Sequence, residues 1–473
     1  MNKPCTIKIY DEINCQLFGL EQQHTQFLYN KLGIFKDGHQ YTPLFQLKKW
    51  DGRIRFFDKV NKTYVKILDE IVPYLEAWGY DISIDDVRPH ISKIEESIQI
   101  NEDIFNSTVK LRPYQVQGVN DLLAAGYGFG VFSTGAGKTL MCAAMAYTYA
   151  SRGLPTLIIV PSSDLITQTI AEFKIAFENL DPLISVGEYS GSLKQINNPI
   201  VVATWQSLNN APHYMEYFKA VIVDECHGVT ASVIRELINN HGRHIYHRFG
   251  ITGTMPKDKV SEYNLKISIG QVISSISAKW LIENKYLSEV EIQPIETHDE
   301  DDGFPDYPSE KAFLSRNDDR LTALAIMIIE ARNKYGNTLV LVNTIAQGTL
   351  LSNLIEGSVF LSGASDKELR QENYKQYADR DDVILIATSG IASTGISIDR
   401  IFCLFLIDAG KSFVRAIQSI GRGLRRKGDK NKVFVKDVYS KLKFSKKHFK
   451  DRAKWYKEAQ YPITTVFKYK YLE

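Results

Sequence analysis

The stretch FSTGAGKTL, residues 132–140, lies between a short apolar run and an apolar segment of helical length, LMCAAMAYTYA. Its glycines let backbone N–H groups curve around phosphate oxygens, and a helix that begins directly after them points its N-terminus at the same anion. The predicted phosphate-binding loop consists of Thr134, Gly135, Ala136, Gly137, Lys138 and Thr139. We expect Lys138 to reach the β- and γ-phosphates and the Thr139 hydroxyl to bind Mg²⁺. The strict motif has Gly where this chain has Phe132, so only its second half matches.

An acidic motif, AVIVDECH at residues 220–227, lies farther along the chain. In proteins with a phosphate-binding loop, a strand that ends in an acidic residue supplies the carboxylate that positions Mg²⁺. We therefore expect Asp224 to hold the metal and Glu225 to orient or deprotonate the attacking water. Cys226 and His227 lack the paired spacing of a zinc site, so no zinc is expected. These motifs predict hydrolysis of a nucleotide with Mg²⁺ as cofactor.

Short apolar runs typical of buried strands recur from about residue 105 to the end of the chain. They are rich in Val and Ile and nearly continuous, which indicates strands that are buried on both faces of a parallel sheet. The runs are 156–160, 200–203, 220–223, 248–251, 339–342, 383–387, 403–407 and 433–435. They form two groups, which the turn-rich stretch THDEDDGFPDYPSE separates. The pattern predicts an α/β fold with two parallel-sheet domains.

Before residue 100 the pattern changes to short alternating stretches such as CTIKIYDE and RIRFFD. Alternation with period two is typical of half-buried strands, so we predict a small, separate N-terminal α+β domain. The predicted domains are residues 1–98, 99–287 and 288–473.

Six further motifs appear in a fixed order around the two described above. They are LRPYQVQGV (111–119), VPSSDLITQ (160–168), VATWQSL (202–208), TGT (252–254), ATSGIASTGISID (387–399) and QSIGRGLRR (418–426). Together with the DECH box, they resemble the motifs of superfamily 2 helicases of the DExH type. The resemblance implies two RecA-like motor domains that close on ATP and part after its hydrolysis, which moves the protein along a nucleic-acid strand.

The resemblance also implies roles for individual residues. Gln115 would read the adenine base, and Gly395 would contact the nucleotide. Ser162, Thr204 and Thr388 would contact successive phosphates of a nucleic-acid strand. In the last motif, Arg422 and Arg425 are spaced to face one side of a helix, with Gln418 one turn earlier. Arginine supplies a fixed, planar charge to a phosphoryl group in transfer, so these side chains would complete the hydrolysis site.

Two motifs depart from the pattern of the superfamily. Ser397 occupies the position at which many relatives have Asp or Asn, so it is not assigned a nucleotide-binding role. The triplet TGT is Ser-Ala-Thr in many RNA-directed members, which separates this chain from that branch.

The N-terminal stretch FKDGHQYTPLFQLKKWDGRIRFFD, residues 35–58, interleaves aromatic and basic residues. In a strand, Arg53 and Arg55 would share one face, so these arginines and Trp50 are candidates for nucleic-acid contact. The stretch resembles the small N-terminal domain of the phage UvsW-type helicases, and the later motifs are similar to that family too. The family resemblance implies a motor that remodels branched DNA by branch migration, fork regression and R-loop unwinding, with the N-terminal domain on duplex DNA.

Charge is unevenly distributed, although the net charge of the chain is only +2. Residues 422–458 contain fifteen Lys or Arg against four Asp or Glu, which favours a polyanionic partner or a solvated surface. We predict that residues 437–461 include a helix that packs on the second motor domain and adds to DNA affinity.

Composition and cysteine use indicate the cellular setting. The five cysteines are scattered without a close pair, as is typical of a reducing compartment, and neither a signal peptide nor a membrane span is recognisable. We expect a cytoplasmic monomer, located in the host cytoplasm if a phage encodes it, whose partner is branched or duplex DNA.

Other functions remain open on the sequence alone. An RNA helicase or the translocase subunit of a restriction system would use the same motor on another nucleic acid. In an ATP-gated binding switch, ATP would change affinity without movement, although such a switch has less need of Glu225 and two arginines. A zinc-dependent enzyme would have to be built on Cys226 and His227.

Overall fold

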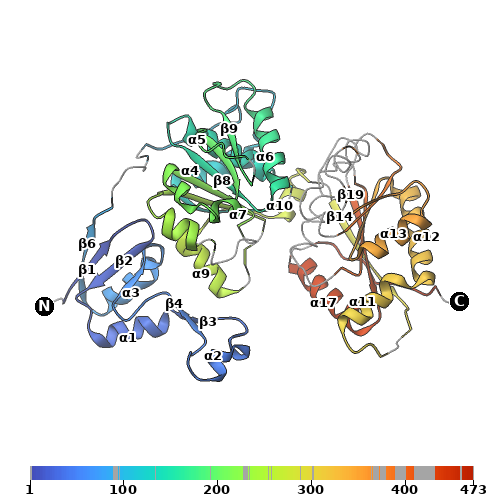
Figure 1. The fold of residues 1–473 in the computed structure, drawn as a ribbon, viewed down its shortest axis with the longest axis horizontal. Coiled ribbons are helices and arrows are strands. Elements are labelled where there is room, and N and C mark those ends of the chain that lie inside the picture. Colours follow the sequence, from blue (N-terminus) through green and yellow to red (C-terminus); the bar gives the residue numbers. More distant parts are fainter. Residues whose placement is uncertain are drawn as a thin grey trace. The chain divides into compact units, whose positions relative to one another are not determined.

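The computed structural model of the chain describes residues 3–471 apart from 89–93, 95, 134, 192, 227–232, 234, 254, 257, 288, 301–302, 364, 366–371, 373–379, 389–400, 410–431 and 459–460. The chain divides into two compact units. The first consists of residues 1–132 and 137–275, and the second of residues 133–136 and 276–473. Each unit contains a seven-stranded sheet (Figure 1). The domain boundaries after residues 98 and 287 stay a prediction.

The first unit begins with a small module built on a sheet with the strand order β5-β2-β1-β6. Its elements are β1 (Lys3–Ile9), β2 (Asn14–Phe18), α1 (Gln22–Lys31), β5 (Lys62–Tyr64), η2 (Val65–Ile67), α3 (Leu68–Ala77) and β6 (Tyr80–Asp86). Alternate residues of β1 are buried, and Cys5 and Ile7 pack in one core with Leu28 of α1. The predicted N-terminal α+β module is confirmed.

A short segment of this module forms a separate two-stranded sheet. It consists of β3 (Gly33–Phe35), η1 (His39–Tyr41), α2 (Pro43–Gln46) and β4 (Arg53–Arg55). The two strands pair antiparallel, with Ile34 opposite Ile54. Figure 1 shows this segment, in dark blue, standing apart from the four-stranded sheet.

The N-terminal module is docked on the rest of the first unit through buried polar contacts. The loop after β1 supplies Glu12, whose backbone N–H donates to the Arg243 carbonyl over 3.0 Å. The fully buried Arg248 donates from Nη2 to the Glu12 carbonyl over 2.9 Å. On a second side, Lys266 pairs with Glu70 over 2.7 Å. Because these contacts join residues far apart in the chain, they fix the module to the motor domain of the same unit.

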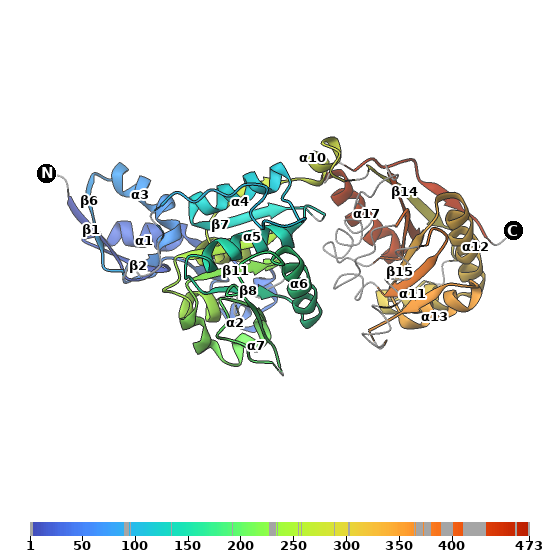
Figure 2. The same ribbon diagram turned by 90° about the horizontal axis from the view of Figure 1, so that it is seen from above.

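The first large sheet has the strand order β13-β7-β12-β11-β8-β10-β9. Its strands are β7 (Tyr127–Phe132), β8 (Thr156–Val160), β9 (Val186–Tyr189), β10 (Ile200–Thr204), β11 (Ala220–Asp224), β12 (His247–Thr252) and β13 (Val272–Ile276). The pairings between neighbours in the order β7-β12-β11-β8-β10-β9 are all parallel. Every residue of β8 and of β10 is buried, so helices cover both faces of the sheet (Figure 2). The predicted continuous apolar strands are confirmed.

Helices alternate with the strands in this unit. They are α4 (Pro113–Ala125), α5 (Lys138–Ala150), α6 (Ser163–Ala176), α7 (Trp205–Asn209), η3 (Pro212–Tyr217), η5 (Arg235–His241) and α9 (Lys259–Ser268). Leu157 and Val221 pack with Met215 and Leu237 in one of the cores of the unit. Parallel strands need such helical crossovers, and their carboxyl ends therefore meet at one edge of the sheet.

The second unit repeats this architecture with the strand order β16-β17-β15-β18-β19-β14-β20. Its elements are α10 (Ala278–Glu283), β14 (Glu289–Thr297), α11 (Tyr307–Arg316), α12 (Asp318–Tyr335), β15 (Thr338–Val342), α13 (Ile345–Leu354), β16 (Val359–Leu361), β17 (Ile384–Thr388), β18 (Cys403–Ile407), β19 (Lys432–Ser440), α17 (Lys443–Glu458) and β20 (Phe467–Tyr469). All pairings in this sheet are parallel. The predicted fold of two RecA-like parallel-sheet domains is confirmed.

A buried ion cluster holds three segments of the second unit together. Arg320 of α12 is fully buried and pairs with Asp299 over 3.1 Å and with Asp408 over 2.8 Å. Asp408 directly follows β18, and burial raises the pKa of its carboxyl while Arg320 opposes that effect. A buried charge is tolerated only when it is paired, so each member depends on the others.

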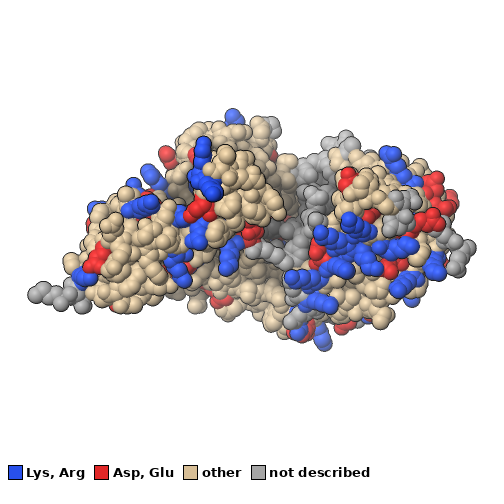
Figure 3. Space-filling view, turned by 90° about the horizontal axis from the view of Figure 1, so that it is seen from below, with Lys and Arg blue, Asp and Glu red and all other residues tan. Residues whose placement is uncertain are grey.

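The basic C-terminal segment contains α17, which packs on the second sheet as predicted, although residues 437–440 of that segment belong to β19 and not to the helix. Arg452 donates to both carboxylate oxygens of the buried Asp437 over 3.0 and 2.7 Å. At its other end, the Glu310 carboxylate accepts the backbone N–H groups of Phe444 and Ser445 over 2.9 and 2.6 Å. A carboxylate at a helix N-terminus satisfies unpaired N–H groups and the helix dipole. Figure 3 shows Lys and Arg side chains gathered on one face of this unit.

Among the helices of the described ranges, none is long and apolar enough to cross a membrane.

Candidate active site

The phosphate-binding loop joins β7 to α5, as the sequence predicts. Gly135 and Gly137 have φ angles of 86° and 78°, which residues with a Cβ atom rarely adopt. A Cβ atom at Gly137 would also lie 2.3 Å from Nε2 of Gln115. These glycines therefore allow α5 to begin at Lys138, and the N-terminus of a helix is a place where backbone N–H groups can bind an anion. Thr139 is the next residue of that turn.

Lys138 lies between the loop and the acidic motif. Its ammonium Nζ is 3.2 Å from Oε1 of Glu225 and 3.4 Å from the Phe132 carbonyl oxygen. Both side chains are largely buried, with 11% of Lys138 and 20% of Glu225 exposed. The structure therefore brings together two residues that are 87 positions apart in the sequence. Lys138 was predicted to reach the β- and γ-phosphates, and Glu225 to act on the attacking water.

Glu225 is held in an uncommon backbone conformation directly after β11. Its φ angle is 46°, in the left-handed region, which costs a residue with a side chain about 1–3 kcal/mol. Its backbone N–H donates to Oδ1 of Asp224 over 2.9 Å. The turn thus places two adjacent carboxylates at the carboxyl edge of the sheet.

Cys226 belongs to the core of the unit. It is fully buried, and burial raises the pKa of its thiol, while a hydrogen bond with Thr252 opposes that effect. Because β11 and β12 are neighbours, the acidic motif lies beside Thr252, which ends β12 and begins the TGT motif. Across the described positions, no three His, Cys, Asp or Glu side chains converge as metal ligands do. His227 lies outside the described residues.

Gln115 lies on α4, beside the phosphate-binding loop. Its Oε1 accepts the backbone N–H of Arg112 over 2.8 Å, and only 3% of the residue is exposed. The Gln115 side chain is therefore bonded to the N-terminus of α4, and its amide nitrogen lies beside Gly137 of the loop. Its predicted contact with adenine stays a prediction.

The two predicted strand-contact residues of the first unit lie on neighbouring loops. Thr204 ends β10 and is paired in register with Val160, the last residue of β8. Thr204 caps α7 by accepting the Ser207 N–H over 3.3 Å, and Gln206 donates to the Pro161 carbonyl over 3.4 Å.

Ser162 is the N-cap residue of α6, and its buried hydroxyl has no hydrogen-bond partner among the described residues. It therefore has spare capacity for a ligand oxygen. Thr388 ends β17 in the second unit and is partly buried. Their contacts with nucleic acid stay predictions.

The N-terminal candidates are held by contacts within their own module. The Arg53 guanidinium lies 4.3 Å from the centre of the Phe35 ring. That of Arg55 lies 4.5 Å from the Tyr29 ring and pairs with Asp51. The Trp50 indole N–H donates to the Arg53 carbonyl over 2.9 Å. Nucleic-acid contact by these residues stays a prediction, and the pairing of Arg55 was not indicated by the sequence.

Several predicted site residues lie outside the described residues, and their roles stay predictions. They are Thr134, Gly395, Gln418, Arg422 and Arg425.

Comparisons with known proteins match this organisation. Three protein-family models match successive parts of the chain: "DNA helicase UvsW, N-terminal" at residues 14–85, "Type III restriction enzyme, res subunit" at 108–257 and "Helicase conserved C-terminal domain" at 319–427. The ATP-dependent DNA helicase uvsW of Enterobacteria phage T4 is 26% identical over 430 residues, which cover 85% of this chain and 84% of that protein. The chain is an ATP-dependent, UvsW-like helicase of superfamily 2. The resemblance to the phage UvsW-type helicases, first indicated by the sequence motifs, is confirmed.

Solved structures show that the helicase has the expected fold. A fragment of an HsdR subunit of a type I restriction enzyme from Vibrio vulnificus is 16% identical, with a TM-score of 0.58, over 79% of this chain and 72% of that one. Mss116p bound to single-stranded RNA and AMP-PNP is 13% identical, with a TM-score of 0.59, over 80% and 82%. At these identities the likeness concerns the fold alone.

Proposed function

We propose that this helicase couples ATP hydrolysis to the remodelling of branched DNA, by branch migration, fork regression and R-loop unwinding. The observation that carries the proposal is the Lys138–Glu225 pair at the carboxyl edge of the first sheet, with the Ser162 and Thr204 loops on neighbouring strands. The match of residues 14–85 to a domain of DNA helicases supports DNA as the substrate.

The proposed ATP site uses residues that the first unit positions. The Lys138 ammonium and the N–H groups at the start of α5 would bind the β- and γ-phosphates. Gln115 would bind the adenine edge through its amide. Glu225 would take the proton of the attacking water or orient that water, because its carboxylate already lies at the Lys138 ammonium.

Magnesium fits the proposed donor set. The Thr139 hydroxyl and the Asp224 carboxylate are hard oxygen donors, and Mg²⁺ combines one or two such groups with water and substrate phosphates. When bound, the ion would neutralise charge on the phosphate oxygens. The buried, neutral Cys226 thiol points to no softer metal at this place.

The second motor domain would complete the site. Arg422 and Arg425 would stabilise charge on the phosphoryl group in transfer, Gln418 would support them, and Gly395 would contact the nucleotide. Thr388 would grip the same strand as Ser162 and Thr204. With domains at residues 1–98, 99–287 and 288–473, alternate closing and opening of the motor domains would move the strand.

Steady-state ATP hydrolysis by the purified chain tests this proposal. We would compare no nucleic acid, single-stranded DNA, duplex DNA, a four-way DNA junction and structured RNA, each at saturating ATP and Mg²⁺. The expected result is the strongest stimulation by the junction, which is absent in Glu225→Gln. Removal of Mg²⁺ by a chelator is expected to abolish the activity.

Other outcomes would change the assignment. Stimulation by RNA alone would move the chain to the RNA helicases. A rate that no polymer changes would overturn the motor proposal and leave an ATP-gated switch.

A further inference from the structure

The segment from Gly33 to Arg55, here called the knob, exposes an unusual amount of apolar surface. Tyr41, Leu44 and Leu47 are 78%, 56% and 64% exposed. Clustered apolar side chains on the surface of a soluble domain mark contact sites, whereas single ones are common. The apolar surface of the knob is therefore typical of a contact site.

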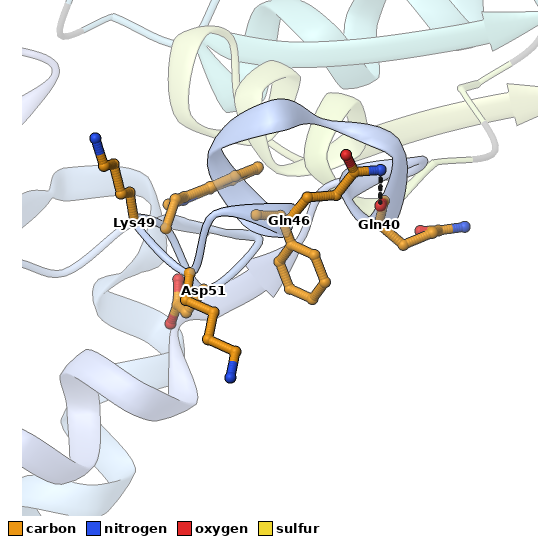
Figure 4. A pocket seen from close by; sticks show the side chains of 7 residues that line it. Gln40, Gln46, Lys49 and Asp51 are labelled. Atoms are coloured by element: carbon orange, nitrogen blue, oxygen red, sulfur yellow. Dashed lines mark hydrogen bonds between the residues drawn. The ribbon is translucent and has the colours of Figure 1, made fainter.

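The knob contains a hollow of about 590 Å³, which lies within the usual size range of small-ligand pockets. The hollow is lined by Gln40, Phe45, Gln46, Lys48, Lys49, Trp50 and Asp51. In Figure 4, Gln40 and Gln46 lie on one side of it, and Lys49 and Asp51 on the other. Residues with aromatic, amide, carboxylate and ammonium side chains thus line one space.

The aromatic walls are fixed by contacts inside the knob. The Trp50 indole N–H donates to the Arg53 carbonyl over 2.9 Å, which leaves the ring faces for packing. The Phe45 ring lies edge-on to His39, with 4.9 Å between centroids, and His39 stacks on Phe35. A site that is ordered before the ligand arrives loses less entropy on binding.

The turn between these walls is also held in place. Lys48 has a φ of 56°, and its N–H donates to the Phe45 carbonyl over 2.9 Å. The N–H of Lys49 donates to the Leu44 carbonyl over 2.9 Å. This turn projects two adjacent lysines at the rim, and within the described part of the chain neither ammonium group makes an ion pair.

The charge of the knob complements a polyanion. Residues 33–55 contain five Lys or Arg against two Asp, and Arg55 already neutralises Asp51. Among the residues that the structure describes, the Gln46 amide is held by a single, long hydrogen bond of 3.5 Å to the Gln40 carbonyl. It can therefore turn to a ligand as donor or acceptor, while the Asp51 carboxylate accepts.

We propose that the hollow takes a single unpaired nucleobase, with its ring stacked on Trp50 and Phe45 and its flanking phosphates at Lys48 and Lys49. Every base has a flat π-face, so such a site would be tolerant of sequence. An amide and a carboxylate match the donors and acceptors of a base edge. The inference rests on the proposed function, because junctions and forks supply unpaired bases at the branch point.

Two duplexes that differ at one position provide the test. One carries a single bulged 2-aminopurine, and the other carries an abasic residue at the same place. The unaltered full-length chain is expected to bind the first roughly 5- to 150-fold more tightly, as one base stack on an aromatic ring allows, and to quench the 2-aminopurine fluorescence. A matched pair of RNA duplexes shows whether deoxyribose is required.

Variants assign the effect to the hollow. Trp50→Ala is expected to remove the preference for the bulged base and the quenching. Leu47→Ser, which changes an exposed apolar residue of the knob outside the hollow, is expected to retain both. The comparison of the two ligands on the unaltered chain remains decisive if Trp50→Ala does not fold.

Equal binding of the bulged and abasic duplexes by the unaltered chain would overturn the inference. So would a base preference that Trp50→Ala retains, in which case the exposed apolar residues of the knob would point to a protein partner. ATP hydrolysis stimulated by the four-way junction reports the proposed function separately, so its loss is distinguishable from failure of the base site.

Discussion

The two large sheets share one uncommon feature and use it differently. In each, the central strand ends and an acidic residue follows at once in the left-handed conformation: Glu225 after β11, with a φ of 46°, and Asp408 after β18, with a φ of 47°. Glu225 faces a lysine on the phosphate-binding loop. Asp408 faces Arg320, which also holds the buried Asp299.

The partner distinguishes the two carboxylates. A lysine ammonium on a flexible stem can exchange a carboxylate for a phosphate, whereas an arginine fork fixes its partner in two hydrogen bonds. The backbone carbonyl of Asp408 is also bound, by the Asn343 amide. The same backbone geometry therefore serves catalysis in the first unit, on our proposal, and stability in the second.

The largest expected effect comes from Glu225→Gln. Loss of a general base lowers turnover by about 10²- to 10⁴-fold, so kcat for ATP is expected to fall in that range with little change in the melting temperature. Steady-state ATPase assays with the four-way junction measure it. Glu216→Gln, an exposed acidic residue of the same unit, is the control, and a variant at position 225 with full turnover would contradict the comparison.

Arg320→Met is expected to destabilise the second unit instead. It leaves two buried carboxylates without their cation, and breaking a buried pair in this way costs about 3–5 kcal/mol of the free energy of unfolding. Urea unfolding measures the loss. Arg316→Met, on an exposed neighbouring residue, is expected to stay within about 0.5 kcal/mol. Equal stability of the two variants would refute the structural role of Asp408.

Gln115→Ala tests recognition of the adenine base at the proposed ATP site of the first unit. Removal of one hydrogen bond to the base weakens binding by about 0.5–1.5 kcal/mol, so the preference for ATP over GTP is expected to fall roughly 2- to 12-fold. The ratio of kcat/KM for the two nucleotides measures it. Gln117→Ala changes an exposed amide on the same helix, which pairs with Asp121. An unchanged preference in Gln115→Ala would remove the residue from base recognition.

Lys66 of the docked N-terminal module is a partly buried lysine whose ionisation Arg248 of β12 affects. Burial lowers its pKa to about 6, and Arg248 adds to the effect. Between that value and the ordinary value near 10.5, the unfolded chain binds a proton that the folded chain does not. The free energy of unfolding therefore rises with pH in this window, by at most about 1.4 kcal/mol per pH unit.

Lys66→Met is expected to stabilise the first unit at pH 7 and to flatten the rise in stability between pH 7 and 9. Urea unfolding at several pH values measures both effects. Lys62→Met, on an exposed residue of the same module, serves as the control. A slope that remains in Lys66→Met would place its origin in another group.

Local patterns predicted the strands and the phosphate-binding loop correctly, because both features depend on residues that are adjacent in the sequence. The apolar run 156–160 is β8, and the loop at 132–140 connects a strand to a helix. The Asp299–Arg320–Asp408 cluster left no such signal, since its members come from three separate segments. Likewise, Arg55 was predicted to be available for nucleic acid, and nothing in RIRF indicated its pairing with Asp51.

The hollow in the knob shows the same limit. The stretch that contains FQLKKW was predicted to contact nucleic acid, and this stays a prediction. The turn that arranges Phe45 and Trp50 around one space depends on the conformation of Lys48. A non-glycine residue with a left-handed backbone conformation has no reliable signature in a single sequence.

ATP-dependent branch migration of a synthetic four-way DNA junction tests the central proposal most directly. The unaltered chain with ATP and Mg²⁺ is expected to convert the junction into two duplex products, whereas Glu225→Gln, or the unaltered chain without ATP, is expected to leave it intact. Conversion that does not need ATP, or its absence under conditions in which the junction stimulates hydrolysis, would contradict the proposal of a branched-DNA motor.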